Sequence, residues 1–352
     1  MRKILITGSS GLIGSELVAF FSQRGWKVHG IDNNMRADFF GPQGDTGKIQ
    51  KRLSDHFPEF EHHACDVRDR NRILELVKII RPHAVVHAAA QPSHDLASRR
   101  PFDDFDVNAQ GTLNLLEATR QTDPDVPFVF LSTNKVYGER PNNLPLVELA
   151  TRWDYSEKKN AQGIDETMPV DHTLHSLFGA SKLAADILVQ EYGRYFGIPT
   201  CCLRCGCVTG PNQSGVELHG FLNYLVKCNV FNLNYRILGH KGKQVRDNIH
   251  SFDVAAFVHE FIQEPREGEV YNLGGGRGNS ISILEAFAEV ESISGKKMIF
   301  GYTDAARKGD HICYITNIEK AKRHFRNWTI SKDLPSILEE IYKAYNKLSK
   351  QD

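Results

Sequence analysis

The sequence predicts an α/β fold: a doubly wound parallel sheet with a smaller C-terminal domain. Short apolar runs alternate with helical patterns through the first half of the chain, as expected of parallel strands joined by crossover helices. A glycine-rich turn, residues 8–14, lies between the first apolar run and the first helical pattern. At 352 residues the chain is long enough for one large unit or two closely packed domains.

Short runs rich in apolar residues predict the buried strands. In chain order these are residues 4–7, 27–31, 60–64, 84–87, 128–131 and 200–204, with a returning strand at 269–272. Apolar residues spaced three and four apart predict the helices. These are residues 12–24, 71–80, 108–120, 178–195, 219–229, 253–263, 283–292 and 333–347. The polar stretch 139–175 is too long for an ordinary connection, so we expect an inserted loop or lid.

The charge balance excludes one class of partner. Lys plus Arg and Asp plus Glu number 43 each, so we expect no broad basic surface for nucleic acid. No apolar run reaches the roughly 18 residues of a membrane-spanning helix, and the N-terminal run is too short for a signal peptide. We therefore expect a cytoplasmic protein that does not contact membranes.

Seven cysteines are present, and Cys202 and Cys205 form a Cys-x-x-Cys pair. A zinc site would need a second pair at comparable spacing, which the sequence lacks. Cys201 and Cys202 lie in a predicted buried strand, where cysteine is a common small apolar residue. We therefore expect reduced thiols and no metal site.

The turn at residues 8–14 predicts a dinucleotide site. Its three glycines allow a tight turn, bring the backbone close to a pyrophosphate and let the helix pack on the strand. The first amide groups of the helix then face the phosphate charge. We assign to the cofactor Gly8, Ser10, Gly11, Leu12 and Ile13.

Asp32 ends the second predicted strand. A carboxylate there accepts hydrogen bonds from the adenosine ribose and repels a 2′-phosphate, so the sequence favours NAD over NADP. Asn33 and Arg36 follow closely and belong to the same predicted site, although the Arg36 guanidinium would soften the preference.

Several segments together resemble the extended short-chain dehydrogenases/reductases. They are the Gly-x-x-Gly-x-x-Gly turn, Asp66-Val67, His87-Ala88-Ala89-Ala90, Asn108-x-x-Gly111-Thr112 and Leu131-Ser132-Thr133. Within that family the chain is similar to the CDP-paratose (CDP-tyvelose) 2-epimerases. The segments that carry this similarity are residues 132–138, His175-Ser176, Gly179-x-Ser181-Lys182 and residues 242–247.

The resemblance implies a Rossmann domain, residues 1–204 and 247–276, and a sugar-nucleotide domain, residues 205–246 and 277–352. It also implies a homodimer or homotetramer, and NAD that is reduced and reoxidised within each turnover. It places at the cofactor Asp66, Val67, Ala88, Ala89, Ala90, Asn108, Ser132, Lys182 and Arg204. It places at the sugar nucleotide Thr133, Asn134, His175, Ser176 and Cys207, with Arg246 and Arg307 on the diphosphate.

The catalytic residues implied by the resemblance are Thr133, Lys182 and the residue at Phe178, where the family has the tyrosine of Tyr-x-x-x-Lys. The family's lysine lowers the pKa of that tyrosine, whose phenolate takes the hydroxyl proton. A phenyl ring has no proton to exchange. Three interpretations stay open: another base, a weakened relative, or an engineered Tyr-to-Phe variant. The candidate substitutes are Lys182, His175, Cys205 and Cys207, and none stands out.

The residues after Thr133 separate the possible reactions. The family's dehydratases carry Asp-Glu there, and neither Asn134 nor Lys135 can act as a carboxylic acid, so dehydration is disfavoured. The string at residues 133–138 favours epimerisation of a nucleotide-diphosphate sugar, preferably CDP-linked, at carbon 2. The alternatives are a 4-epimerase or another nucleotide-sugar-modifying enzyme, and a non-catalytic binding protein because of Phe178.

Overall fold

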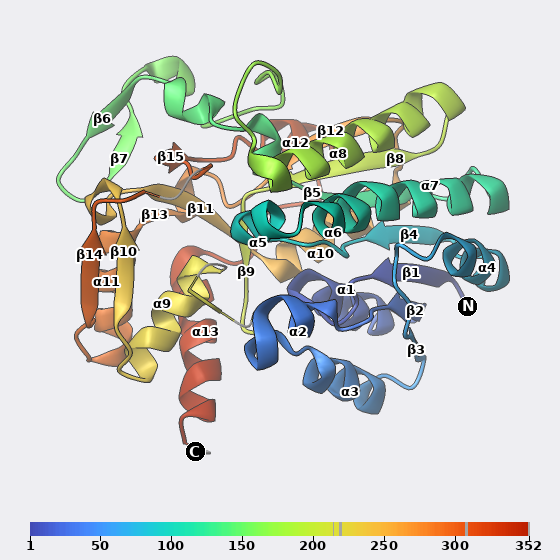
Figure 1. The fold of residues 1–352 in the computed structure, drawn as a ribbon, viewed down its shortest axis with the longest axis horizontal. Coiled ribbons are helices and arrows are strands. Elements are labelled where there is room, and N and C mark those ends of the chain that lie inside the picture. The colour runs from blue at the N-terminus through green and yellow to red at the C-terminus, as the bar shows by residue number, and fades with distance from the viewer. Residues whose placement is uncertain (214, 218–219, 307–308, 351–352) are drawn as a thin grey trace.

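The computed structural model describes residues 1–352 except 214, 218–219, 307–308 and 351–352. Its centre is a seven-stranded parallel sheet in the order β12-β8-β5-β4-β1-β2-β3 (Figure 1). The strands are β1 (Lys3–Thr7), β2 (Lys27–Ile31), β3 (Phe60–His63), β4 (Ala84–His87), β5 (Phe128–Thr133), β8 (Thr200–Cys205) and β12 (Glu269–Leu273). The order reverses between β1 and β4, where doubly wound sheets leave a crevice for ligands.

Helices cover both faces of this sheet. They are α1 (Leu12–Ser22), α2 (Met35–Phe40), α3 (Gly47–His56), α4 (Arg70–Ile80), α5 (His94–Arg99), α6 (Pro101–Phe105), α7 (Gly111–Thr122), α8 (Ser176–Phe196) and α10 (Ser251–Gln263). Ile4 of β1 packs into one core with Leu17 of α1 and Phe257 of α10. Leu5, on the other face, packs into a second core with Leu115 of α7. Most strands are buried on both sides, as their apolar runs predict, whereas the edge strand β3 buries only Phe60. The predicted fold class is confirmed.

Three smaller sheets lie outside the central one. A four-stranded sheet contains β9 (Cys207–Thr209), β11 (Val245–His250), β13 (Ser280–Ser282) and β15 (Cys313–Tyr314), and two pairs are β10 (Tyr235–Leu238) with β14 (Phe300–Thr303) and β6 (Leu146–Glu148) with β7 (Trp153–Tyr155). Three helices, α9 (Phe221–Val230), α11 (Ile283–Ser294) and α13 (Leu334–Leu348), enclose a further core around Leu225 and Phe287, at the left of Figure 1. A short helix, α12 (Glu319–His324), packs on β12. The division into two domains at the predicted boundaries stays a prediction.

The stretch 139–175, expected as a loop or lid, contains the β6–β7 hairpin and is tied to the smaller part of the molecule. Trp153 N donates to Lys243 O at 2.9 Å, and Arg277 pairs with Asp154 at 2.8 Å. The sequence patterns missed this hairpin, together with helices α2 and α3. The described part of the chain contains no helix with the length and apolar character needed to cross a membrane.

Candidate active site

A cavity of about 500 Å³ opens at the carboxyl ends of β1, β2, β4, β5 and β8 and extends to β9, β10 and β11. This is the edge where parallel α/β sheets bind their ligands. The predicted residues found in its wall are Gly8, Ser10, Gly11, Leu12, Ile13, Asp32, Asn33, Arg36, Asp66, Val67, Ala88, Ala89, Ala90, Ser132, Thr133, Asn134, Phe178, Lys182, Cys207 and Arg246. Segments far apart in the chain therefore line one space.

The glycine turn leaves room for a phosphate next to the first helix. Gly8 has a φ of +66°, and a Cβ on Gly14 would lie 1.9 Å from the Gly8 carbonyl oxygen. No side chain caps the N-terminus of α1, so its first amide groups can face an anion. The Ser10 hydroxyl oxygen is buried beside them and has no hydrogen-bond partner among the described residues. The residues present thus fit the pyrophosphate of a dinucleotide.

Asp32 is held at the end of β2 by the turn itself. Its Oδ2 accepts the N–H of Ser10 at 2.9 Å, and its Oδ1 accepts the N–H of Asn34 at 2.8 Å. The carboxylate therefore stands in the cavity wall with both oxygens oriented. Arg36 lies in the same wall, with its guanidinium 4.8 Å from the Phe40 ring centre.

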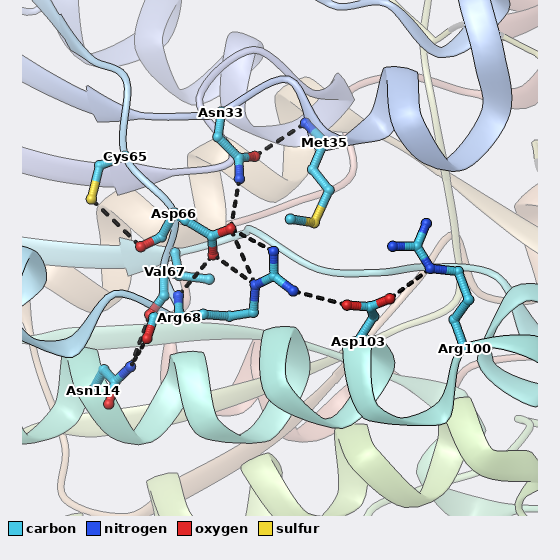
Figure 2. A network of polar contacts seen from close by, with 9 residues as sticks. All are labelled: Asn33, Met35, Cys65, Asp66, Val67, Arg68, Arg100, Asp103 and Asn114. Atoms are coloured by element: carbon cyan, nitrogen blue, oxygen red, sulfur yellow. Dashed lines mark hydrogen bonds and ion pairs between the residues drawn. The ribbon is translucent and has the colours of Figure 1, made fainter.

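A second acidic residue, Asp66, is fixed by the polar contacts shown in Figure 2. Arg68 donates to both of its oxygens at 2.8–3.1 Å, and Asn33 Nδ2 donates to Oδ2 at 3.0 Å. Arg68 in turn donates to Asp103 at 2.9 Å. Burial raises the pKa of Asp66, but the Arg68 bonds outweigh it and hold that pKa below its usual value. The adenine end of the predicted site thus carries an ionised, oriented carboxylate.

At the other end of the predicted cofactor site, the Lys182 side chain extends from α8 to β5. Its Nζ donates to Leu131 O at 2.7 Å and lies 4.0 Å from the Phe130 ring centre. Burial lowers the pKa of Lys182 to about 8. Thr133, at the end of β5, and Phe178, one helical turn before Lys182, complete this corner. The predicted catalytic set is therefore brought together, with a phenyl ring at the position of the family's phenol.

One residue beside Phe178 escaped the sequence reasoning. His94 lines the cavity, and its imidazole centre lies 5.0 Å from the Phe178 ring centre in an edge-to-face contact. Its Nδ1 is 2.7 Å from Ser176 Oγ. The available signal was its place shortly after Ala88–Ala90, directly after the loop that leaves β4 at the ligand edge of the sheet.

The substrate end of the cavity carries a cluster of charges. Arg246 donates to Asp310 Oδ1 at 2.6 Å, and Lys135 donates to the same oxygen at 3.4 Å and to Gly309 O at 3.0 Å. Burial raises the pKa of Asp310, but the two cations lower it well below its usual range. Two cations thus face one carboxylate here, which favours an anionic ligand. Arg307, predicted on the diphosphate, lies outside the described residues.

Four predicted site residues lie behind the wall. The Asn108 side chain bonds to Gln91, Asp104 and Ser181, and Arg204 forms a 2.8 Å ion pair with Asp186. His175 Nε2 lies 3.0 Å from Val136 O, and Ser176 meets His94. In this structure these four side chains support their neighbours, and their predicted contact with ligands stays a prediction.

The cysteines near the site are poor candidates for a base. Both Cys205 and Cys207 line the cavity. Burial raises the pKa of Cys205 to about 12 and that of Cys207 to about 11. Both thiols are therefore protonated at neutral pH, and a thiolate is the form that would accept a proton.

The chain matches the model of the NAD dependent epimerase/dehydratase family over residues 4–274. It is 32% identical over 325 residues to the CDP-paratose 2-epimerase of Salmonella typhi, covering 90% of this chain and 92% of that protein. Its fold is similar to that of the UDP-glucose 4-epimerase of Thermotoga maritima solved with UDP-glucose, at 24% identity and a TM-score of 0.81, covering 99% and 100% of the two chains.

A further similar structure is a tyrosine-to-phenylalanine mutant of the UDP-glucuronic acid 4-epimerase of Bacillus cereus. It was solved in complex with UDP-4-deoxy-4-fluoro-glucuronic acid and NAD, and matches at 25% identity with a TM-score of 0.80, covering 99% of this chain and 100% of that one. The family match covers most of the chain, and the glycine turn, Asp32 and Lys182 line one cavity. The chain therefore belongs to the NAD dependent epimerase/dehydratase family and is an NAD-dependent enzyme of the extended short-chain dehydrogenase/reductase type.

Proposed function

We propose that the protein epimerises a nucleotide-diphosphate sugar at carbon 2 by transient oxidation. The observation that carries the proposal is the continuity of the cavity. It runs from the phosphate turn and Asp32, past Thr133 and Lys182, to the cations Lys135 and Arg246. NAD held in the first half would accept a hydride from the sugar carbon and return it to the opposite face. The cationic end suits the diphosphate of the second ligand.

The residues of the chain divide the remaining tasks. Thr133 and Lys182 both line the cavity, and we assign to the Thr133 hydroxyl a hydrogen bond with the reacting hydroxyl. The Lys182 ammonium, buried and held by a backbone carbonyl, places a positive charge beside the oxygen on which negative charge develops. Arg246 fixes the diphosphate, so the sugar meets the cofactor in one orientation.

The charges near Thr133 disfavour dehydration. Expulsion of a hydroxyl needs a general acid close to the sugar, and the family's dehydratases have carboxylic acids directly after the threonine. Asn134 and Lys135 stand at the two positions after Thr133, and Lys135 bonds Asp310. Because its lowered pKa keeps Asp310 ionised, that carboxylate has no proton to give. Inversion by hydride return removes no hydroxyl group, so it does not need an acid that protonates a leaving hydroxyl.

Carbon 2 and a CDP-linked sugar are supported by the similarity to the CDP-paratose 2-epimerase of Salmonella typhi. The test is turnover of CDP-, UDP- and dTDP-linked sugars in deuterated buffer, followed by NMR. We expect inversion at carbon 2, fastest for a CDP-sugar, without deuterium at that carbon. Inversion at carbon 4 would replace the proposal by 4-epimerisation, and deuterium at carbon 2 would show enolisation instead of hydride return.

A further inference from the structure

We propose that His94 is the catalytic acid–base residue, which takes and returns the proton of the reacting hydroxyl in place of the phenol that Phe178 lacks. This inference deepens the proposed function and rests on it. His94 begins α5 directly after the loop that leaves β4, and its side chain lines the cavity together with Thr133 and Lys135.

His94 lies against the ring that would carry the missing oxygen. The His94 and Phe178 ring centres are 5.0 Å apart and their planes meet at 67°. A phenol would extend the Phe178 ring by a single oxygen atom. An imidazole in contact with that ring therefore occupies the same corner of the site, beside Thr133 at the end of β5.

Ser176 orients the His94 ring. His94 Nδ1 and Ser176 Oγ are 2.7 Å apart, and the same oxygen accepts the N–H of Gly179 at 3.3 Å. Ser176 has a φ of +61°, a left-handed conformation that is uncommon for a residue with a side chain. Such outliers persist where the surroundings fix them, and they cluster at functional sites. The first residue of α8 is thus strained where its hydroxyl meets His94.

The two imidazole nitrogens can serve two tasks. With Nδ1 bonded to Ser176, we assign the exchanged proton to Nε2. In the forward step the hydroxyl proton passes to Nε2, and the carbon–hydrogen electron pair leaves as a hydride to NAD, which yields a ketone. In the return step the hydride adds to the other face of the carbonyl carbon, and the imidazolium gives its proton back to the oxygen. Histidine commonly acts as a general acid and base in catalysis.

The other candidate bases are held by backbone carbonyls, keep their protons or lie outside the cavity wall. Lys182 and Lys135 each donate to a backbone carbonyl, at 2.7 and 3.0 Å. The raised pKa values of Cys205 and Cys207 keep both thiols protonated. His175 lies outside the cavity wall, with its Nε2 3.0 Å from a backbone carbonyl oxygen.

The test follows the first half of the reaction, through the absorbance of reduced nicotinamide when a CDP-linked sugar meets the NAD-loaded protein. We expect His94→Gln to slow this step by about 10²–10⁴-fold, the usual contribution of a general base, with NAD affinity unchanged. Phe178→Tyr added to His94→Gln should recover about tenfold or more, because the phenol then takes the proton. Free imidazole should partly restore His94→Gln.

His83→Gln is the matched control. His83 Nδ1 also holds a hydrogen bond, from the Lys3 N–H at 3.0 Å, but the residue lies at the opposite end of β4. Its variant should react at the wild-type rate.

Two results would overturn the role of His94: a His94→Gln rate within about threefold of wild type, or a slow His94→Gln that neither imidazole nor Phe178→Tyr restores. The second would mark His94 as structural. Inversion at carbon 4 with the rate pattern intact would contradict the proposed function alone. A wild-type protein that forms no reduced nicotinamide with any nucleotide sugar would overturn both proposals.

Discussion

Both carboxylate oxygens of Asp32 accept backbone hydrogen bonds, one from Ser10 in the turn and one from Asn34. These bonds fix the carboxylate in the cavity wall, so a ligand hydroxyl meets an acceptor that is already oriented. They also fix a negative charge close to the predicted ribose position. We therefore expect the Asp32 carboxylate to be the main determinant of discrimination between NAD and NADP, with Arg36 in the same wall softening the preference.

We expect NAD to bind more tightly than NADP, because the fixed Asp32 carboxylate repels a 2′-phosphate. Asp32→Ala should weaken NAD binding by about 1–3 kcal/mol, the range for hydrogen bonds to a charged group. The difference between the NAD and NADP affinities should therefore become smaller. Calorimetry with both cofactors measures this. Asp55→Ala, which removes an exposed carboxylate paired with Lys51, is the control. Equal affinity of the wild-type protein for NAD and NADP would contradict the assignment.

Arg246 is buried and shares Asp310 with Lys135. We expect Arg246→Ala to weaken nucleotide-sugar binding by about 1–3 kcal/mol and to leave NAD binding nearly unchanged, because the guanidinium lies at the substrate end of the cavity. Titration of each ligand separately measures the two effects. Arg72→Ala, at an exposed helical ion pair, should change neither. An equal loss for both ligands would mean that the variant disturbs the fold instead of the diphosphate.

Local motifs identify residues whose roles are fixed by chain position, such as Asp32 after a strand and Lys182 four residues after Phe178. His94 could not be found in this way. Its contact with Phe178 joins the first residue of α5 to the first turn of α8, and that proximity exists only after the sheet has formed. The pairing of Arg246 with Asp310 is likewise a tertiary contact.

The first β–turn–α unit depends on close packing as well as on backbone freedom. A methyl group on Gly14 would meet the Gly8 carbonyl oxygen at 1.9 Å, and this oxygen belongs to the backbone, so it cannot turn away as a side chain could. The helix can approach the strand closely only because position 14 has no side chain. The same approach brings the amide groups of α1 to the phosphate position.

We expect Gly14→Ala to lower the free energy of unfolding by about 1–3 kcal/mol or more, since the overpacked contact must be relieved by moving the helix. NAD affinity should fall in parallel, because the displaced amide groups no longer face the pyrophosphate. Chemical denaturation and calorimetry measure these effects. Gly278→Ala, where a Cβ would meet nothing within 4 Å, is the control. A Gly14→Ala protein with wild-type stability would show that the turn is not tightly packed.

The sequence predicts helices and strands best where a strand is buried on both faces of the sheet. The strands β2 and β4 have the predicted bounds, because their apolar runs are buried on both faces. The prediction fails for short or half-exposed elements: β13 has three residues, and α2 has no buried residue, so neither leaves a periodic pattern. The predicted helix 108–120 begins instead with a π-helical turn, Asp106–Gln110, which continues into α7.

Several histidines are buried in the interior of the protein. His87 is fully buried between β1 and α7, with Nδ1 2.6 Å from Thr7 Oγ1 and Nε2 3.0 Å from Thr112 Oγ1. Burial, with a smaller effect of Lys182, lowers the pKa of His87 to about 3. Burial likewise lowers the pKa of His29 to about 4.

The oligomeric state stays a prediction from the family resemblance. Ile187 and Tyr195 on α8 expose apolar surface that a second copy of the chain could cover.

The lowered pKa values of His87 and His29 predict how the free energy of unfolding depends on pH. The pKa of His87 is lower in the folded protein than the ordinary value of about 6.5 in the unfolded chain, so between these values only the unfolded chain binds the proton. The free energy of unfolding should therefore be highest above about pH 6.5 and fall with acidification, by about 1.4 kcal/mol per pH unit for each such histidine. His87→Asn should lower stability at neutral pH, because it disturbs two buried hydrogen bonds, but reduce this slope. Urea denaturation at a series of pH values between about 7.5 and 4.5 measures both effects, with the exposed His172→Asn as a control that keeps the wild-type slope. A His87→Asn protein with the wild-type slope would show that His87 takes up its proton in the folded state, and that the acid sensitivity of this fold originates elsewhere.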